Sequence, residues 1–152
     1  MKKLWLFLLL LFPLWGLPPF ISFEERIKEC SFIMIGNIKI VWQKRLFEDT
    51  YLVSFLVETQ EILKNTYQNQ NLEIPKNFFL YIYVYPETYE NKIKFKPEDG
   101  KYILFLNPVV KENQIVNFEL YEEEPFALEP WSKEKELEIR AIISQQNSTS
   151  EG

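Results

Sequence analysis

The carboxylate side chains are the first place where this sequence could support chemistry. Glu122 to Glu124 form the densest acidic run, and a proline follows it. Such a run can hold a hard cation, but the alternating Asp/Asn spacing of a calcium loop is absent, so we expect a solvated acidic turn. Glu58 and Glu61 have the residue types of a general acid and base. Their sequence positions do not set the separation such a pair needs, so we predict no catalytic residue and no metal site.

The remaining composition narrows the chemistry further. The chain has no histidine, which excludes Ser-His and Cys-His nucleophilic systems and every metal site that uses histidine. Cys30 is the only cysteine, so it has no disulfide partner in the chain, and we expect a buried, inert thiol. None of the four glycines lies in a phosphate-cradling pattern. We therefore predict a protein that is not an enzyme and that uses no cofactor.

One cluster combines basic and aromatic residues: Lys92, Lys94, Phe95, Lys96, Lys101 and Tyr102. Single-stranded nucleic acids bind to such clusters by stacking bases beside a positive groove. The net charge of the chain is −5, however, and it falls to about −7 if an N-terminal leader carrying two lysines is removed. A negative protein repels phosphate backbones, so we expect no nucleic-acid partner. Lysines at alternate positions instead protect a strand edge from pairing with other chains.

The segment FFLYIYVYPETY, residues 78–89, alternates strictly, as a strand with two different faces does. One face carries Phe78, Leu80, Ile82 and Val84, which we expect to fill the interior of the barrel, and the other carries Tyr81, Tyr83 and Tyr85. A tyrosine face either stays open as a binding surface or packs beneath another element, because the side chain combines an apolar ring with a wet hydroxyl. We name the three tyrosines as candidate binding residues. The apolar stripe of the C-terminal helix needs burial, which favours packing of that helix on the tyrosine face.

Alternation predicts four further strands, which must position that face. The first runs from Cys30 with apolar residues at period two through Trp42, and Gly36 marks a bulge or sharp bend in it. A polar stretch from residue 43 to residue 49 predicts a hairpin connection. The other strands are expected at residues 50–65, 102–106 and 114–121, with a charged edge segment at 92–96. Residues 102–106 are apolar on both faces, so this strand must be covered twice.

Two short helices flank these strands. Ser22 and Glu25 have the capping-box spacing for a helix that ends near Glu29. Ser132 is a plausible cap for a C-terminal helix, and residues 145–152 form a polar tail that we expect to be flexible. Several antiparallel strands with a bent first strand predict a small closed or partly closed barrel, occupying residues 22–144.

The N-terminal segment, residues 1–21, predicts export. Two lysines precede an apolar run from Leu4 to Phe12, which is the layout of a secretory signal peptide. Apolar residues continue beyond Pro13, so an uncleaved membrane anchor is the alternative, although the prolines disfavour an unbroken spanning helix. We expect a periplasmic or extracellular protein that contacts a membrane only through this segment, if it is retained.

Three of the predicted strands resemble a known family. Residues 30–38 are similar to the "A-D-x-V-x-x-G-x-V" opening of secreted OB-fold modules related to the netrin-like domain and to tissue inhibitors of metalloproteinases. Residues 53–65 resemble their "V-x-x-x-L-K-G" strand, with Asn65 in place of glycine, and residues 96–106 resemble "G-x-x-Y-L-L-F-L". The resemblance implies a five-stranded OB-like barrel. It does not extend to metalloproteinase inhibition, because Cys30 lacks a partner cysteine and is not expected at a new N-terminus.

Together these features predict a mainly β, exported binding module whose partner is another extracytoplasmic protein. The alternative is an envelope structural protein tethered by its uncleaved N-terminal segment.

Overall fold

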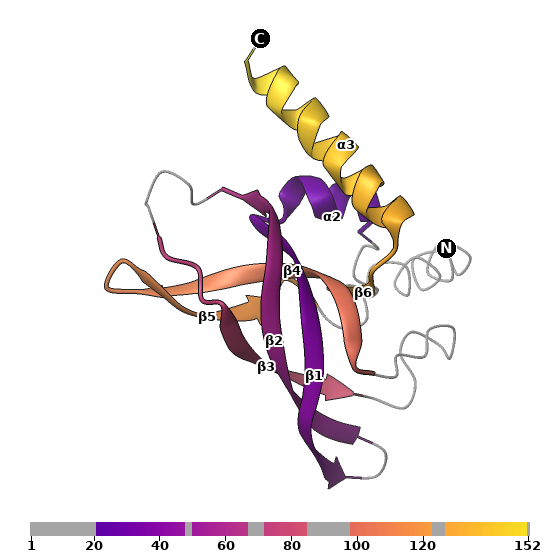
Figure 1. Ribbon diagram of the computed structural model, residues 1–152, viewed down its shortest axis with the longest axis vertical. Helices are drawn as coiled ribbons and strands as arrows, with labels where there is room; N and C mark the ends of the chain where they lie inside the picture. Colours follow the sequence, from indigo (N-terminus) through magenta and orange to yellow (C-terminus); the bar gives the residue numbers. More distant parts are fainter. Residues whose placement is uncertain (1–20, 48–49, 67–71, 85–97, 123–126, 152) are drawn as a thin grey trace, which may run out of the picture.

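The computed structural model of the protein describes residues 21–47, 50–66, 72–84, 98–122 and 127–151 (Figure 1). The described chain is mainly β with two helices, as predicted. In chain order the elements are α2 (Phe23–Glu29), β1 (Phe32–Phe47), β2 (Thr50–Asn65), β3 (Asn77–Val84), β4 (Gly100–Lys111), β5 (Gln114–Leu120), β6 (Leu128–Pro130) and α3 (Lys133–Ser150). The sheet has six described strands, one more than predicted, because β6 pairs with β4.

All pairings in the sheet are antiparallel, in the order β3-β2-β1-β4-β5. Among the described residues no backbone ladder joins the end strands β3 and β5, so hydrogen bonds do not close the predicted barrel. The two end strands nevertheless approach each other. The rings of Phe78 on β3 and Phe118 on β5 have centroids 4.7 Å apart. The sheet therefore curls enough for its two ends to share apolar contacts.

Gly36 lies at one of the bends of the long strand β1, as its position predicted. The register with β2 shifts between Ile35 and Gly36. A Cβ atom at this position would lie 3.0 Å from the carbonyl oxygen of Glu58 and 3.1 Å from Val57 Cγ1. Only glycine lets the two strands approach this closely without displacement.

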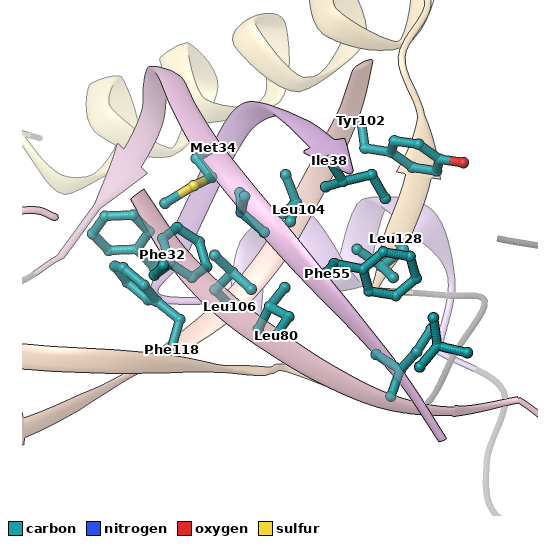
Figure 2. Packing of buried hydrophobic residues seen from close by; sticks show 14 of the residues in the cluster. Phe32, Met34, Ile38, Phe55, Leu80, Tyr102, Leu104, Leu106, Phe118 and Leu128 are labelled. Carbon is teal, nitrogen blue, oxygen red and sulfur yellow. The ribbon is translucent and has the colours of Figure 1, made fainter. Parts of the chain in front are cut away.

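The curled sheet encloses the larger apolar core (Figure 2). Alternation places residues from β1, β2, β3, β4 and β5 in it. Of the interior residues predicted for β3, Phe78, Leu80 and Ile82 are buried in this core, and Val84 is partly buried against it. The buried members are Phe32, Met34, Ile38, Val53, Phe55, Val57, Phe78, Leu80, Ile82, Tyr102, Leu104, Leu106, Ile115, Phe118 and Leu128. Burial of these side chains supplies the main driving force for folding.

A second core lies on the opposite face of β1 and β4, beneath the helices. Ile103 and Phe105 of β4 belong to it, while Tyr102 and Leu104 face the larger core, so the strand is covered on both faces as predicted. From α3, Ile139 and Ile142 pack here. The prediction that the C-terminal helix covers the tyrosine face is therefore wrong. Figure 1 shows the reason: α2 and α3 lie at one end of the molecule, and the β1–β2 hairpin projects at the other.

Both helices begin at their predicted caps. Ser22 and Glu25 form a complete capping box on α2, and the Ser132 side chain accepts a hydrogen bond from the amide of Lys135 at the start of α3. Helix α3 continues to Ser150. The residues expected to form a flexible tail are thus helical over most of their length.

Two predicted strand ends are wrong. Residues 43–47 belong to β1 and not to a hairpin connection, because they remain paired with β2. Strand β4 continues through Pro108 to Lys111. Proline is tolerated here because Pro108 pairs only with Phe118 of β5, whereas the β1 ladder on the other side ends at Leu106. Residues 1–20 of the predicted leader and the predicted edge segment 92–96 lie outside the described residues.

Candidate functional site

The strongest candidate site is an exposed aromatic surface on the outer face of β1, β2 and β3. Tyr81 and Tyr83 are 57% and 50% exposed, and the neighbouring Phe79 on the same face is 46% exposed. Trp42 of β1 joins them with 42% of its side chain exposed. We call these four residues the aromatic face. Tyr85, the third tyrosine predicted to bind, lies outside the described residues.

Strand register brings the aromatic face together. Trp42 pairs with Ser54 of β2, and Ser54 pairs with Tyr81 of β3. Since strands β1 and β3 lie two strand spacings apart, about 9.6 Å, the 6.2 Å between the Trp42 and Tyr81 ring centroids means that the rings lean toward each other. Ser54 beneath them is only 1% exposed. The centre of the face is thus a ring pair over a small residue.

Two lysines flank this ring pair. Lys39 pairs across β2 with Leu56, which in turn pairs with Phe79. Lys44 is related in the same way, through Leu52, to Tyr83. Both lysines are exposed, and within the described part of the chain neither takes part in a salt bridge. The face therefore combines open aromatic rings with two positive charges on one side.

The sequence places Trp42 in the same period-two apolar series as Ile38 and Ile40, but the structure puts it on the opposite face of the sheet from those two residues. The register between β1 and β2 shifts between Ile40 and Trp42, so Val41 is an extra residue at this bulge. A one-residue insertion moves the following side chains to the opposite face of the sheet. No residue type at Val41 signals this shift. The alternation of residues 78–84, by contrast, already put Phe79 on the tyrosine side.

The carboxylates considered for chemistry take part in ion pairs or stay exposed. Glu122 accepts a hydrogen bond from the nearly buried guanidinium of Arg26, which also lies over the Phe105 ring. Glu61 accepts a hydrogen bond of 2.6 Å from Arg140 on α3. In the ranges that the structure describes, no group of histidine, cysteine, aspartate and glutamate side chains could hold a metal ion. Glu123 and Glu124 lie outside those ranges.

Other candidate groups are also held by structural contacts. The ammonium group of Lys101 lies 4.0 Å from the centroid of the Trp131 ring. Cys30 is buried, and burial raises the pKa of its thiol. Burial, together with a hydrogen bond to Glu29, raises the pKa of Tyr121 to about 12. These groups take part in contacts within the fold, so we do not consider them binding residues, and the aromatic face is the remaining candidate site.

No protein-family model matches the sequence, and no curated protein matches it significantly. Among the described helices, none is both long enough and apolar enough to cross a membrane. By its described architecture the chain is a mainly β protein with an antiparallel sheet, one face of which exposes aromatic side chains.

Proposed function

We propose that the protein is an exported, non-enzymatic binding module that holds another extracytoplasmic protein on its aromatic face. The observation that carries this proposal is the exposure of four large aromatic side chains on one face of an otherwise well-packed sheet. Contiguous exposed apolar surface is rare on monomeric proteins and marks interaction sites.

The residue types favour a protein partner. Tyrosine and tryptophan are enriched at protein interfaces, where they dominate the binding energy. Each offers a broad apolar ring and one polar group, so it can pack against a partner and still satisfy a hydrogen bond. Seven of the large exposed hydrophobic side chains of the described chain belong to β1 and β3: Val41, Trp42, Leu46, Phe47, Phe79, Tyr81 and Tyr83. These two strands therefore carry most of the large exposed hydrophobic side chains of the described chain.

We propose a partly open barrel of the OB type as the scaffold, related to the netrin-like modules that the sequence resembles. The packing of Phe78 against Phe118, which connects the two end strands over a common core, supports it. OB folds are five-stranded, partly open barrels that bind ligands on their sheet surface. Metalloproteinase inhibition is not part of the proposal, because Cys30 is buried and follows helix α2.

Export through the N-terminal segment is the part of the proposal that one mass measurement tests. A cleaved signal peptide predicts that intact protein isolated from the native envelope or medium lacks the apolar N-terminus. Material that still carries residues 1–16 would support the alternative, an envelope protein tethered by an uncleaved anchor. Retention of the protein inside the cell would contradict export.

Site-directed photo-crosslinking tests the binding surface. A benzophenone side chain placed at Tyr81 should give a discrete crosslinked product with a partner in the native envelope. The same group at Val116 is the matched control, because Val116 is a strand residue that is 51% exposed but lies on β5. Equal products from both positions, or none from position 81, would contradict the proposed surface.

A further inference from the structure

We propose that the partner on the aromatic face is a second copy of this chain, which docks there through the outer side of its helix α3. This inference rests on the proposed function and names the partner. The docking surface on α3 consists of Glu134, Leu137, Glu138 and Ala141, which we call the outer stripe. The two surfaces differ, so each contact joins α3 of one copy to the aromatic face of another.

The outer stripe lies on the side of α3 that faces away from the second core. Its residues are spaced i, i+3, i+4 and i+7, which places them together on one side of a helix. All four are exposed, whereas Ile139 and Ile142 are buried on the other side. Leu137 is 54% exposed, and among the described helices it is the one large hydrophobic side chain with such exposure. The stripe therefore offers an apolar contact that is exposed on a single copy.

The charges of the outer stripe complement those beside the aromatic face. Glu134 and Glu138 form one row along α3, and Leu137 and Ala141 form a second row beside it. The aromatic face has the same division, because its two flanking lysines are on β1 and three of its four rings are on β3. Within the described chain no salt bridge involves either glutamate or either lysine. Docking would bring the apolar row onto the rings and the acidic row onto the lysines.

The spacing of the two sets of charges also agrees. Lys39 and Lys44 pair with residues of β2 that are four positions apart, so their Cα atoms are separated by about 13 Å along the strand. Glu134 and Glu138 are about one helical turn apart, roughly 6 Å along the axis of α3. When the two pairs are centred on each other, the difference is about 4 Å at each end. The four-carbon stem of a lysine spans that difference, so both lysines can reach a carboxylate.

A single copy cannot make this contact with itself. Helix α3 packs on the second core through Ile139 and Ile142, and it lies at the end of the molecule opposite the projecting β1–β2 hairpin (Figure 1). Contacts between unlike surfaces either close into a ring, of which a reciprocal pair is the smallest, or continue from copy to copy. Both arrangements use the same pairing of α3 with the aromatic face.

Other occupants fit the aromatic face less well. Two aromatic faces packed against each other would bring together the flanking lysines of both copies, and like charges repel. A nucleic acid is opposed by the net charge of −5. A foreign acidic protein would satisfy the same lysines, and the composition of the captured complex distinguishes it from a second copy.

Charge reversal tests this inference with protein isolated from the native host, and analytical ultracentrifugation measures self-association. One variant carries Lys39→Glu and Lys44→Glu, and a second variant carries Glu134→Lys and Glu138→Lys. Each should associate with itself about tenfold more weakly, or weaker still, because two ion pairs become repulsions. An equimolar mixture should associate again, since every contact between the two variants joins opposite charges. A variant that had merely misfolded could not be rescued in this way.

Control variants and a chemical crosslink localise the contact. Lys111→Glu and Glu119→Lys reverse exposed charges on β4 and β5, and each should change the association constant less than twofold. A short bis-maleimide should join a Tyr81→Cys chain to a Leu137→Cys chain. It should not join a Tyr81→Cys chain to a Val116→Cys chain, because Val116 is similarly exposed but lies on β5.

Several outcomes would overturn the inference. They are a chain that stays monomeric at millimolar concentration, association that both charge reversals leave unchanged, a mixture that does not recover association, and equal crosslinking of position 81 to positions 116 and 137. A benzophenone at Tyr81 that captures only a different protein would also overturn it, but would support the proposed function. Absence of any product at position 81 would contradict the proposed function itself, so the two failures are distinguishable.

Discussion

Replacing Phe118 by alanine should destabilise the protein more than any surface substitution. Phe118 is 1% exposed, and its ring lies 4.8 Å from that of Phe32 and 4.7 Å from that of Phe78, measured between centroids. It therefore connects β5 with β1 and β3 across the larger core. Truncating a buried phenylalanine to alanine costs about 3–5 kcal/mol, since it removes apolar burial and leaves a cavity. That is a large part of a typical folding free energy of roughly 5–15 kcal/mol.

Urea unfolding followed by circular dichroism measures this cost. With a denaturant dependence of about 2 kcal/mol per molar urea, the midpoint of Phe118→Ala should fall by about 1.5–2.5 M. Val116→Ala provides the control on the same strand, because Val116 is half exposed, and it should change stability by less than about 1 kcal/mol. A loss below about 1 kcal/mol for Phe118→Ala would refute the account that the two ends of the sheet share one interior.

Three further substitutions test individual features of the fold. Gly36→Ala should cost about 1–3 kcal/mol in urea unfolding, because the new Cβ would lie 3.0 Å from the Glu58 carbonyl oxygen; unchanged stability would show that the strands separate freely. The pKa of Tyr121 is raised to about 12, so its neutral form stabilises the fold below pH 10 and this contribution is lost as the pH rises toward 12. Tyr121→Phe should remove that part of the alkaline loss of stability, and an identical pH profile for the variant would contradict the role of its hydrogen bond to Glu29. Ser22→Ala should destabilise the protein by about 1 kcal/mol through loss of the cap on α2, while an unchanged melting temperature would mean that tertiary contacts alone hold this helix.

The strands and caps were predictable because local patterns determine them. Strict alternation identified β2 from Thr50 to Asn65 and the interior face of β3. Side-chain hydrogen bonding at Ser22 and Ser132 fixed where both helices begin. These features depend on residues near one another in the sequence, so a pattern along the chain contains the necessary information.

The features that the sequence did not predict depend on contacts between distant segments. The bulge at Val41 puts Trp42 on the outer face, and it arises from register with β2. Pro108 continues β4 because the β1 ladder has already ended, which no local pattern reveals. The sequence offered two apolar surfaces that α3 could cover, the tyrosine face of β3 and the second apolar face of residues 102–106. The second apolar face of residues 102–106 already required a cover, and assigning the helix to it would have left the tyrosines open.

The candidate site was therefore predicted in part. Tyr81 and Tyr83 were named from alternation alone, and their exposure agrees with the open alternative. Trp42 and the flanking lysines joined the site only through the strand register. A surface built from three strands has contributions that no single strand can indicate.

The most direct test of the account compares folding and binding in one variant. Tyr81→Thr combined with Tyr83→Thr removes both open rings but keeps residues that favour strands. The account predicts that urea unfolding changes by less than about 1.5 kcal/mol, because both side chains are at least half exposed. The partner identified by crosslinking should be captured by this variant about tenfold less, or weaker still, because an interface that loses its aromatic anchors loses most of its binding energy. A sharp loss of stability with unchanged capture would contradict the account, since the tyrosines would then support the fold and not the partner.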